Sequence, residues 1–427
     1  MPLEKNPFGD RLAQLLTQHG ISQNRLAQQL GISRSTVTGW IKHGTLPDAG
    51  LLKMLCEALD CSADWLIGVG QQREKQDAAG VIHWAEEIPP FIPDVQREPI
   101  EHGLRLFHGL VNETHTAPEI RSRYPPQFIR SALQAAFRSG AIRLTAVTRA
   151  TNLEHRLREK YPFLKDAVVA EIPGQCEDTL IRTELVTFLA ATQVLTRVIR
   201  EGAIGLGSGY TMLRFVEHSI PSADQFSGTA WVPLLAFAPH NMSDYSANLL
   251  ARLMSIRHPG SRALYLPHPA ECATPEMQAV AAETQRYQHN LQTIFASVSG
   301  VDRRDGTGES HLLTEFRSAD YAAEAPFLRD AYARLPDKSR FGGELLRYLL
   351  DTEGQILSHD EAVGSQVNLD ILRYNSDMIG RVCLIAARRY KALPILTCLK
   401  HRLANAVVID REIAETLLDE SSIGNST

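Results

Sequence analysis

The sequence predicts a multidomain protein in which an all-α head precedes a small module of helices and a strand, followed by a large α/β domain. Three observations lead to this prediction. The chain has 427 residues, which is too long for one compact core. Residues 1–70 show helical periodicity broken by tight glycine turns. From residue 151 to about 420, helical segments alternate with short β-branched runs, which is typical of a mainly parallel sheet.

Composition excludes several classes of protein. The hydrophobic fraction of 44% and the charged fraction of 22% are those of an ordinary globular chain, and the net charge is −5. Any contact with nucleic acid must therefore come from local positive charge. The six cysteines form no C-x-x-C pair, which argues against a zinc site or a disulfide framework. The N-terminus lacks the apolar core of a signal peptide and no uncharged stretch could span a bilayer, so we expect a cytoplasmic protein.

The head is expected to contain two short helices joined by a tight turn. Ser22 can cap the first of them, and Ser33 can cap the second after the turn Gly31-Ile32-Ser33. The second helix places Val37 and Trp40 on its inner side. Two helices joined in this way form a helix-turn-helix, and the second helix is the one that fits the major groove of DNA.

The outward side of this recognition helix carries hydroxyl and cationic side chains, which suit base edges and phosphates. Gln23, at the start of the preceding helix, is placed to reach a phosphate. The candidate DNA-binding residues are Gln23, Arg34, Ser35, Thr36, Thr38 and Lys42. Residues 1–70 hold six Lys/Arg and six Asp/Glu, so we expect binding to require a dimer. The alternative is a helical bundle that is used only for protein contacts.

The string ISQNRLAQQLGISRSTVTGWIKHGTLP resembles the Cro/phage-repressor (XRE-type) helix-turn-helix family. The resemblance covers residues 8–67, including the trailing DCSADWLIG, and it implies an operator-binding head. One departure from the family pattern is Gly39, which is a poor helix former and weakens the recognition helix by about 1 kcal/mol relative to alanine.

A linker and a second module are expected between the head and the α/β domain. Residues 71–98 are polar and aperiodic at first, then too proline-rich for a helix. Residues 99–150 predict a first helix, a second one opened by the capping box Thr116–Glu119, a third helix and a strand. This order resembles the winged-helix module that opens SorC-type regulators. Seven Arg against three Glu in residues 100–150 fit a DNA-facing surface, and a dimerisation spacer is the alternative.

Within the α/β domain, the motif Gly205-Leu-Gly207-Ser208-Gly209-Tyr210-Thr211 follows a strand and precedes a helix. Glycines let the backbone approach an anion closely, while N–H groups and the helix N-terminus bind it. The motif is neither a Walker loop nor a dinucleotide fingerprint. The alternative is a simple tight turn. The expected strands of the domain are 167–172, 203–207, 231–237, 263–267, 293–301 and 404–410, with a long helix before the second.

Over about residues 152–419 the chain resembles the sugar-binding domain of SorC-type regulators. The resemblance rests on five segments in this order: NLEHRLREKYPFLKDAVVAEIP, GAIGLGSGYTM, SGVD, GGELLRYLLDTEG and ANAVVIDREIAETLL. That family shares the fold of ribose-5-phosphate isomerase and glucosamine-6-phosphate deaminase and binds phosphorylated sugars. The resemblance implies that the glycine loop holds the sugar or its phosphate, that Gly300 and Asp302 line the cleft and that Glu344 lies near sugar hydroxyls. The implied loop residues are Gly205, Gly207, Ser208, Gly209 and Thr211.

One departure from the family concerns a second phosphate contact. The family has a Gly-Gly turn and a lysine before its last helix, whereas this chain has Ala386-Ala387-Arg388-Arg389-Tyr390-Lys391. Either Arg388 or Lys391 substitutes, or the ligand differs or has been lost.

The histidines and carboxylates give no enzyme signature. None of the 15 histidines falls into a metal-binding motif, so neither a metal nor a cofactor is expected. His240, after an expected strand, is predicted to line the cleft. These observations predict a transcription regulator, not an enzyme, whose operator binding is controlled by a sugar phosphate and which acts as a homodimer or homotetramer. The alternatives are a regulator with a lost or protein-type effector and an isomerase-fold enzyme tethered to DNA.

Overall fold

The computed structural model divides into two compact units, residues 1–74 and 75–427. The described residues are 7–420, without 19–20, 44, 60–65, 67–74, 77–81, 87–93, 112–119, 121–122, 174–178, 199–201, 223, 238–244, 301–334, 336, 338–339, 360–362 and 379.

The smaller unit is helical, as expected. Its helices are α1 (Pro7–Gln18), α2 (Gln23–Leu30), α3 (Arg34–His43) and α4 (Ala49–Leu59). The Ser22 side chain caps α2 by accepting a hydrogen bond from the Arg25 amide, 3.2 Å away, and Gly31 ends the helix in a left-handed conformation with φ of 65°. Leu26 and Trp40 are buried in the core of this unit. The predicted helix-turn-helix is therefore confirmed.

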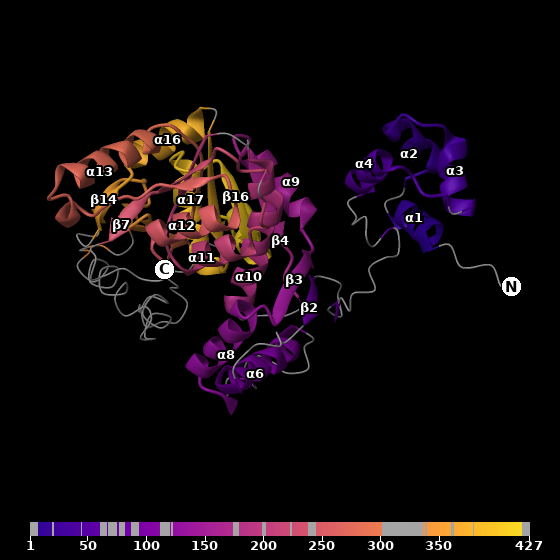
Figure 1. Cartoon of the computed structure of the whole chain (residues 1–427), viewed down its shortest axis with the longest axis horizontal. Helices are drawn as coiled ribbons and strands as arrows, with labels where there is room; N and C mark the ends of the chain where they lie inside the picture. Colours follow the sequence, from indigo (N-terminus) through magenta and orange to yellow (C-terminus); the bar gives the residue numbers. More distant parts are fainter. Residues whose placement is uncertain are drawn as a thin grey trace. The chain divides into compact units, whose positions relative to one another are not determined.

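The larger unit begins with a small antiparallel sheet and two helices. These elements are β1 (Lys75–Gln76), β2 (Ile82–Glu86), α6 (Asp94–Val111), α8 (Pro126–Arg138) and β3 (Ile142–Val147). β2 pairs with β3, so part of the expected linker 71–98 belongs to this sheet. Figure 1 shows α6 and α8 side by side. Gly103 allows this packing, because a Cβ there would collide with the Ala132 carbonyl.

The expectation that the proline-rich segment before residue 99 forms no helix is wrong from residue 94 on, because α6 begins at Asp94 and contains Pro99. A proline inside a helix removes one backbone hydrogen bond. Burial of Phe107 and Leu110 on the same helix outweighs that loss. The expected capping box Thr116–Glu119 lies outside the described residues.

A seven-stranded, all-parallel sheet forms the centre of the larger unit, which confirms the predicted α/β class. Its spatial order is β4 (Asp166–Ala170), β16 (Ala406–Asp410), β15 (Arg381–Ala386), β9 (Leu291–Ala296), β5 (Ala203–Leu206), β6 (Ala230–Pro233) and β8 (Arg262–Ala263). β15 was not among the expected strands, although it lies between two of them.

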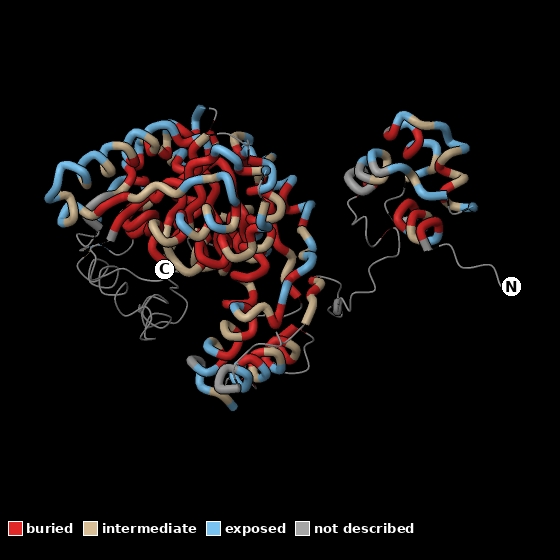
Figure 2. Tube along the Cα trace, in the orientation of Figure 1, coloured by how far each residue is buried: buried red, intermediate tan, exposed pale blue. Residues whose placement is uncertain are grey.

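Helices cover both faces of this sheet (Figure 1). Along β16, Val408 faces one buried cluster and Val407 and Ile409 face the other, as the two-residue period of a strand requires. Most strand residues are buried (Figure 2): β5, β6 and β16 are buried at every residue, whereas the two residues of the edge strand β8 are not. One face carries α10 (Thr179–Leu189), α11 (Tyr210–His218) and α12 (Ala247–Arg257), and the other carries α9 (Thr151–Lys160), α16 (Leu369–Asp377), α17 (Ala392–Lys400) and α18 (Arg411–Leu418).

Two of the expected long strands are each divided between two sheets. Residues 231–237 form β6 and β7 (Leu235–Phe237), and β7 pairs with β14 (Val363–Gln366). Residues 293–301 form β9 and β10 (Val298–Ser299). β10 opens an antiparallel sheet with β11 (Phe341–Leu345), β12 (Tyr348–Asp351) and β13 (Ile356–His359). Of the expected strand 263–267 only Ala263 lies in a strand, the two-residue β8.

Candidate functional site

The surface of α3 presents most of the candidate DNA-binding side chains. Arg34, Ser35 and Lys42 are exposed. Ser33 caps the helix, since its hydroxyl accepts from the Thr36 amide at 3.2 Å. The Thr38 hydroxyl lies 3.1 Å from Gln23 Oε1 and 3.0 Å from the Arg34 carbonyl, so it donates to one of them. Gln23 on α2 thus lies within hydrogen-bond distance of Thr38 on α3.

The parallel sheet has a topological switch point between β5 and β9. After β5 the chain passes through α11 to β6 on one side, whereas after β9 it returns to β15 on the other side. Neighbouring strands whose connections leave in opposite directions open a crevice at their carboxyl ends, where α/β proteins bind ligands. The glycine loop follows β5 directly, so the fold places it at this crevice.

The glycine loop is fixed at both ends by backbone hydrogen bonds. The Gly207 amide donates to the Phe295 carbonyl of β9 at 2.9 Å, and the Gly209 amide donates to the Tyr245 carbonyl at 3.0 Å. Gly209 caps α11 with φ of 103°, a conformation that favours glycine. A Cβ at Gly209 would meet none of the described atoms within 4 Å. Ser208 is half-buried and Thr211 is buried on the first turn of α11.

Gly205 has a different environment from the rest of the motif. It lies inside β5, and a Cβ there would be 2.7 Å from Leu234 Cδ2 and 3.1 Å from Leu291 Cδ1. Close apolar packing therefore accounts for glycine at this position.

The hairpin of β11 and β12 lies against the glycine loop. Leu345 pairs with Tyr348, so Leu346 and Arg347 form a two-residue turn, with φ of 50° and 67°. A Cβ on Gly207 would be 3.1 Å from Leu346 Cδ2, which places the turn at the loop. Both turn residues are buried.

Glu344 lies at the base of the same turn. Its Oε1 accepts a hydrogen bond of 2.6 Å from the Arg347 amide, and it pairs with Ser299, the neighbour of Gly300. Burial, together with the Glu344 carboxylate, raises the pKa of Cys398 to about 12, so this thiol is not a nucleophile at neutral pH. The structure thus brings Glu344 and Gly300 to the edge of the sheet where the glycine loop lies.

The turn after β15 brings cations to the same edge. Arg388 has φ of 84°, although it is not a glycine, and its amide donates to Asp410 Oδ2 at 2.7 Å. Burial raises the pKa of Asp410, and hydrogen bonds from the backbone together with the charge of Arg182 offset part of that rise. Gly300 packs against the Tyr390 carbonyl, so the Arg388–Lys391 turn adjoins the end of β10.

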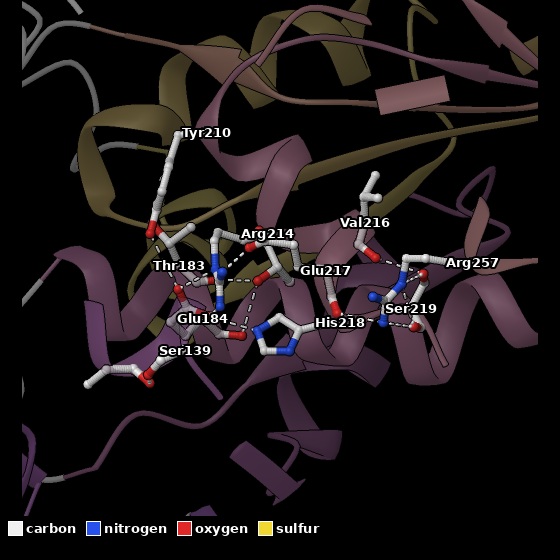
Figure 3. A network of polar contacts seen from close by, with 12 residues as sticks. Ser139, Thr183, Glu184, Tyr210, Arg214, Val216, Glu217, His218, Ser219 and Arg257 are labelled. Carbon is white, nitrogen blue, oxygen red and sulfur yellow. Dashed lines mark hydrogen bonds and ion pairs between the residues drawn. The ribbon is translucent and has the colours of Figure 1, made fainter. Parts of the chain in front are cut away.

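A buried charge network holds α11 against α10 (Figure 3). Arg214 Nε lies 2.7 Å from Glu184 Oε1, and its Nη2 donates to Oε2 at 2.9 Å. His218 Nε2 lies 2.7 Å from the same Oε2, and Tyr210 donates to Oε1 at 3.4 Å. Tyr210 also hydrogen-bonds Gln134 of α8. Burial alone would raise the pKa of Glu184, but Arg214 and His218 hold it below its usual value.

Sequence reasoning missed Tyr210, Arg214 and Glu184 as a unit. The positions 210 and 214 lie one helical turn apart, but Glu184 is 26 residues earlier, so a single sequence gives no signal for the contact. Two candidates, His240 and Asp302, lie outside the described residues. Within the parts of the chain that the structure describes, no group of His, Cys, Asp and Glu could hold a metal ion, and no helix is long and apolar enough to cross a membrane.

Two family models match the chain. A "Helix-turn-helix" model of the XRE type matches residues 12–66, and a model described as "Putative sugar-binding domain" matches residues 145–302. The chain is thus a DNA-binding transcriptional regulator whose larger unit contains a domain that matches this sugar-binding model. Neither model describes an enzyme. The comparison with curated proteins gave no significant match.

Solved structures with a similar chain trace are regulators by their titles. The full-length sorbitol operon regulator SorC from Klebsiella pneumoniae has a TM-score of 0.49 at 20% identity, covering 77% of this chain and 100% of that one. A domain of a "possible sugar-binding transcriptional regulator" from Arthrobacter aurescens has a TM-score of 0.49 at 16% identity, and the match covers 63% of this chain and 97% of that one. The "Probable sor Operon Regulator" from Shigella flexneri has a TM-score of 0.48 at 17% identity, and the match covers 63% of this chain and 99% of that one.

Proposed function

We propose that this regulator binds operator DNA through α2 and α3, and that a phosphorylated sugar at the carboxyl edge of the parallel sheet controls this binding. The observation that carries the proposal is the placement of the loop Gly207–Gly209 at the switch point of the sheet. Backbone N–H groups at the start of a helix favour an anion, and Arg388 and Lys391 on the same edge supply positive charge. A neutral sugar would need neither.

The candidate residues divide by chemistry. The hydroxyls of Ser208 and Thr211 suit phosphate oxygens, whereas the Glu344 carboxylate suits sugar hydroxyls, because an ionised carboxylate only accepts hydrogen bonds. Asp302, His240 and Gly300 are assigned to the cleft from the sequence. Gly205 contributes by packing in β5 rather than by contact with the ligand.

The DNA-binding side of the proposal requires a dimer or tetramer acting in the cytoplasm, where the operator lies. One head carries as many acidic as basic residues, so two heads on paired half-sites are needed for affinity. We assign residues 1–70 to the head, 99–150 to the second module and 151–420 to the effector domain. A ligand that binds two forms of the effector domain with different affinity would change the spacing of the heads.

The test is ligand-dependent thermal stability of the full chain. Sugar phosphates are expected to raise the melting temperature, and their parent sugars at the same concentration are not. Gly207→Val is expected to abolish the rise while leaving operator affinity intact, because the added methyl groups would meet Leu346 and Ala296 at the loop. If no sugar phosphate stabilises the wild-type protein, the effector is of another kind, such as a protein, or has been lost.

A further inference from the structure

The turn between β15 and α17 has a backbone conformation that its first residue disfavours. Arg388 has φ of 84° and ψ of 139°, a region of the Ramachandran plot that is open to glycine and costly for a residue with a Cβ. Residues 389–391 then form a short 3-10 helix that leads into α17, and the Lys391 amide donates to the Arg388 carbonyl at 3.0 Å. Such a conformation persists only where the surrounding structure imposes it.

The buried carboxylate of Asp410 holds this turn. Its Oδ2 accepts a hydrogen bond of 2.7 Å from the Arg388 amide, and its Oδ1 accepts one of 3.0 Å from the Ile413 amide in the first turn of α18. Asp410 is the last residue of β16 and is 0% exposed, so the sheet and α18 fix its position. Ala386 pairs with Ile409, which brings the end of β15 beside it. Both carboxylate oxygens are thus engaged by backbone N–H groups, and one of these belongs to the strained residue.

Arg182 of α10 supports the carboxylate from the other side. Its Nη1 lies 3.5 Å from Asp410 Oδ2 and 2.6 Å from Glu412 Oε2, so it offsets part of the negative charge behind the turn. A carboxylate repels an anionic ligand and is therefore a poor contact for one. Any effect of Asp410 on such a ligand has to pass through the Arg388 amide, which it fixes.

We infer that Asp410 is the positioning residue that holds the Arg388–Lys391 turn in the shape that receives the anionic group of the effector, an inference that rests on the proposed function. The turn adjoins Gly300, where a Cβ would lie 2.3 Å from the Tyr390 carbonyl oxygen, so its path shapes this edge of the sheet. Without Asp410, Arg388 can relax to negative φ, which changes the direction of the residues that follow. Glycine at position 388 would make the turn independent of Asp410, because glycine adopts positive φ without a steric cost.

The experiment measures the affinity of the full chain for inorganic phosphate by isothermal titration calorimetry, with and without Asp410 in two backgrounds. Asp410→Ser keeps a cap for α18 but is too short to reach the Arg388 amide. In the wild-type background it is expected to lower the affinity about tenfold or more, and in the Arg388→Gly background less than about threefold, because glycine keeps the turn. Asp410→Asn, which keeps the shape but presents only one acceptor oxygen, is the second variant if Asp410→Ser does not fold.

The matched control is Asp351→Ser. Asp351 is also buried, and its Oδ1 also accepts hydrogen bonds from two backbone amides, those of Glu353 and Gln355, at 3.0 and 2.8 Å. It lies near the other end of α17, where the neighbouring Thr352 carbonyl is 3.1 Å from His401 Nε2. The variant is expected to lower the melting temperature but to bind phosphate as the wild type does.

The outcomes are distinct. Equal losses of affinity in the two backgrounds, or no loss in either, overturn the assignment of Asp410 and leave the proposed function standing. A gain in affinity also overturns it, because the carboxylate would then only repel the ligand. Loss of binding in Arg388→Gly alone overturns it too, since the ligand would then need the arginine side chain rather than the path of the turn. If the wild-type protein binds neither phosphate nor any sugar phosphate, the proposed function fails and this inference fails with it.

Discussion

Replacing Glu184 by glutamine tests whether the buried network fixes α11, the helix that follows the glycine loop. Glu184 is fully buried, and it contacts both Arg214 and His218 within 2.9 Å. Glu184→Gln keeps the shape but removes the charge, which leaves the Arg214 guanidinium buried beside a neutral amide. Removing one partner of a buried ion pair costs about 3–5 kcal/mol.

The expected change in melting temperature follows from the size of the unit. Residues 75–427 are about 350 residues, and an unfolding entropy of about 2.1 cal/mol/K per residue gives about 0.7 kcal/mol/K. The cost then corresponds to a fall of about 4–7 °C, measurable by differential scanning calorimetry.

The matched control is Glu217→Gln. Glu217 also pairs with Arg214, but its side chain is 30% exposed, so the pair contributes about 1 kcal/mol or less and the fall should be about 1 °C. Adding Arg214→Met to Glu184→Gln should recover part of the loss, because it removes a buried guanidinium that only the partly exposed Glu217 carboxylate would still pair with. Equal melting temperatures for the two single variants would refute the claim that burial makes Glu184 the central member of the network.

Three further predictions concern other parts of the chain. Arg34→Ala should weaken operator binding by about 1–3 kcal/mol and relax the preference at one base pair, whereas Gln23→Ala should weaken all sites similarly, as measured by gel-shift titration. Burial lowers the pKa of His258 to about 4, so its contribution to stability, present above pH 6.5, should be lost as the pH falls toward 4. In denaturant titrations, His258→Asn should therefore remove up to about 3 kcal/mol of the fall in unfolding free energy between these pH values. If the second module touches DNA, replacing Arg130 and Arg138 with alanine should reduce the slope of log affinity against log salt by up to about two units. An unchanged slope, together with a smaller oligomer in light scattering, would identify the module as a dimerisation spacer.

The head could be predicted from the sequence because its signals are local. Ser22, Gly31 and Ser33 mark helix ends within a few residues of the bonds they make, and the structure places them as predicted. The glycine loop was also predictable, because a strand, a turn and a helix follow one another there without interruption.

The β15 strand and the small antiparallel sheet could not be predicted in the same way. The segment RVCLIA is a short apolar run before Ala387, and its membership of the sheet depends on pairing with β9 and β16. Likewise, Pro99 argues for extended chain when only its neighbours are considered, but contacts with α8 stabilise the helix. These elements depend on residues far away in the sequence, for which local propensity carries no information.

In the candidate site, too, the loop could be predicted from local sequence but its contacts with distant residues could not. One of these contacts joins the glycine loop to the second module. Tyr210 comes directly after the loop residue Gly209, and it hydrogen-bonds Glu184 of α10 and Gln134 of α8. The glycine loop and the second module therefore meet at Tyr210. Glu184 also contacts Arg214, so the first turns of α11 are held at two positions. We therefore expect a displacement of the loop to act on the contact with α8, and a double-mutant cycle between Tyr210→Phe and Gln134→Leu would measure the free energy of that coupling.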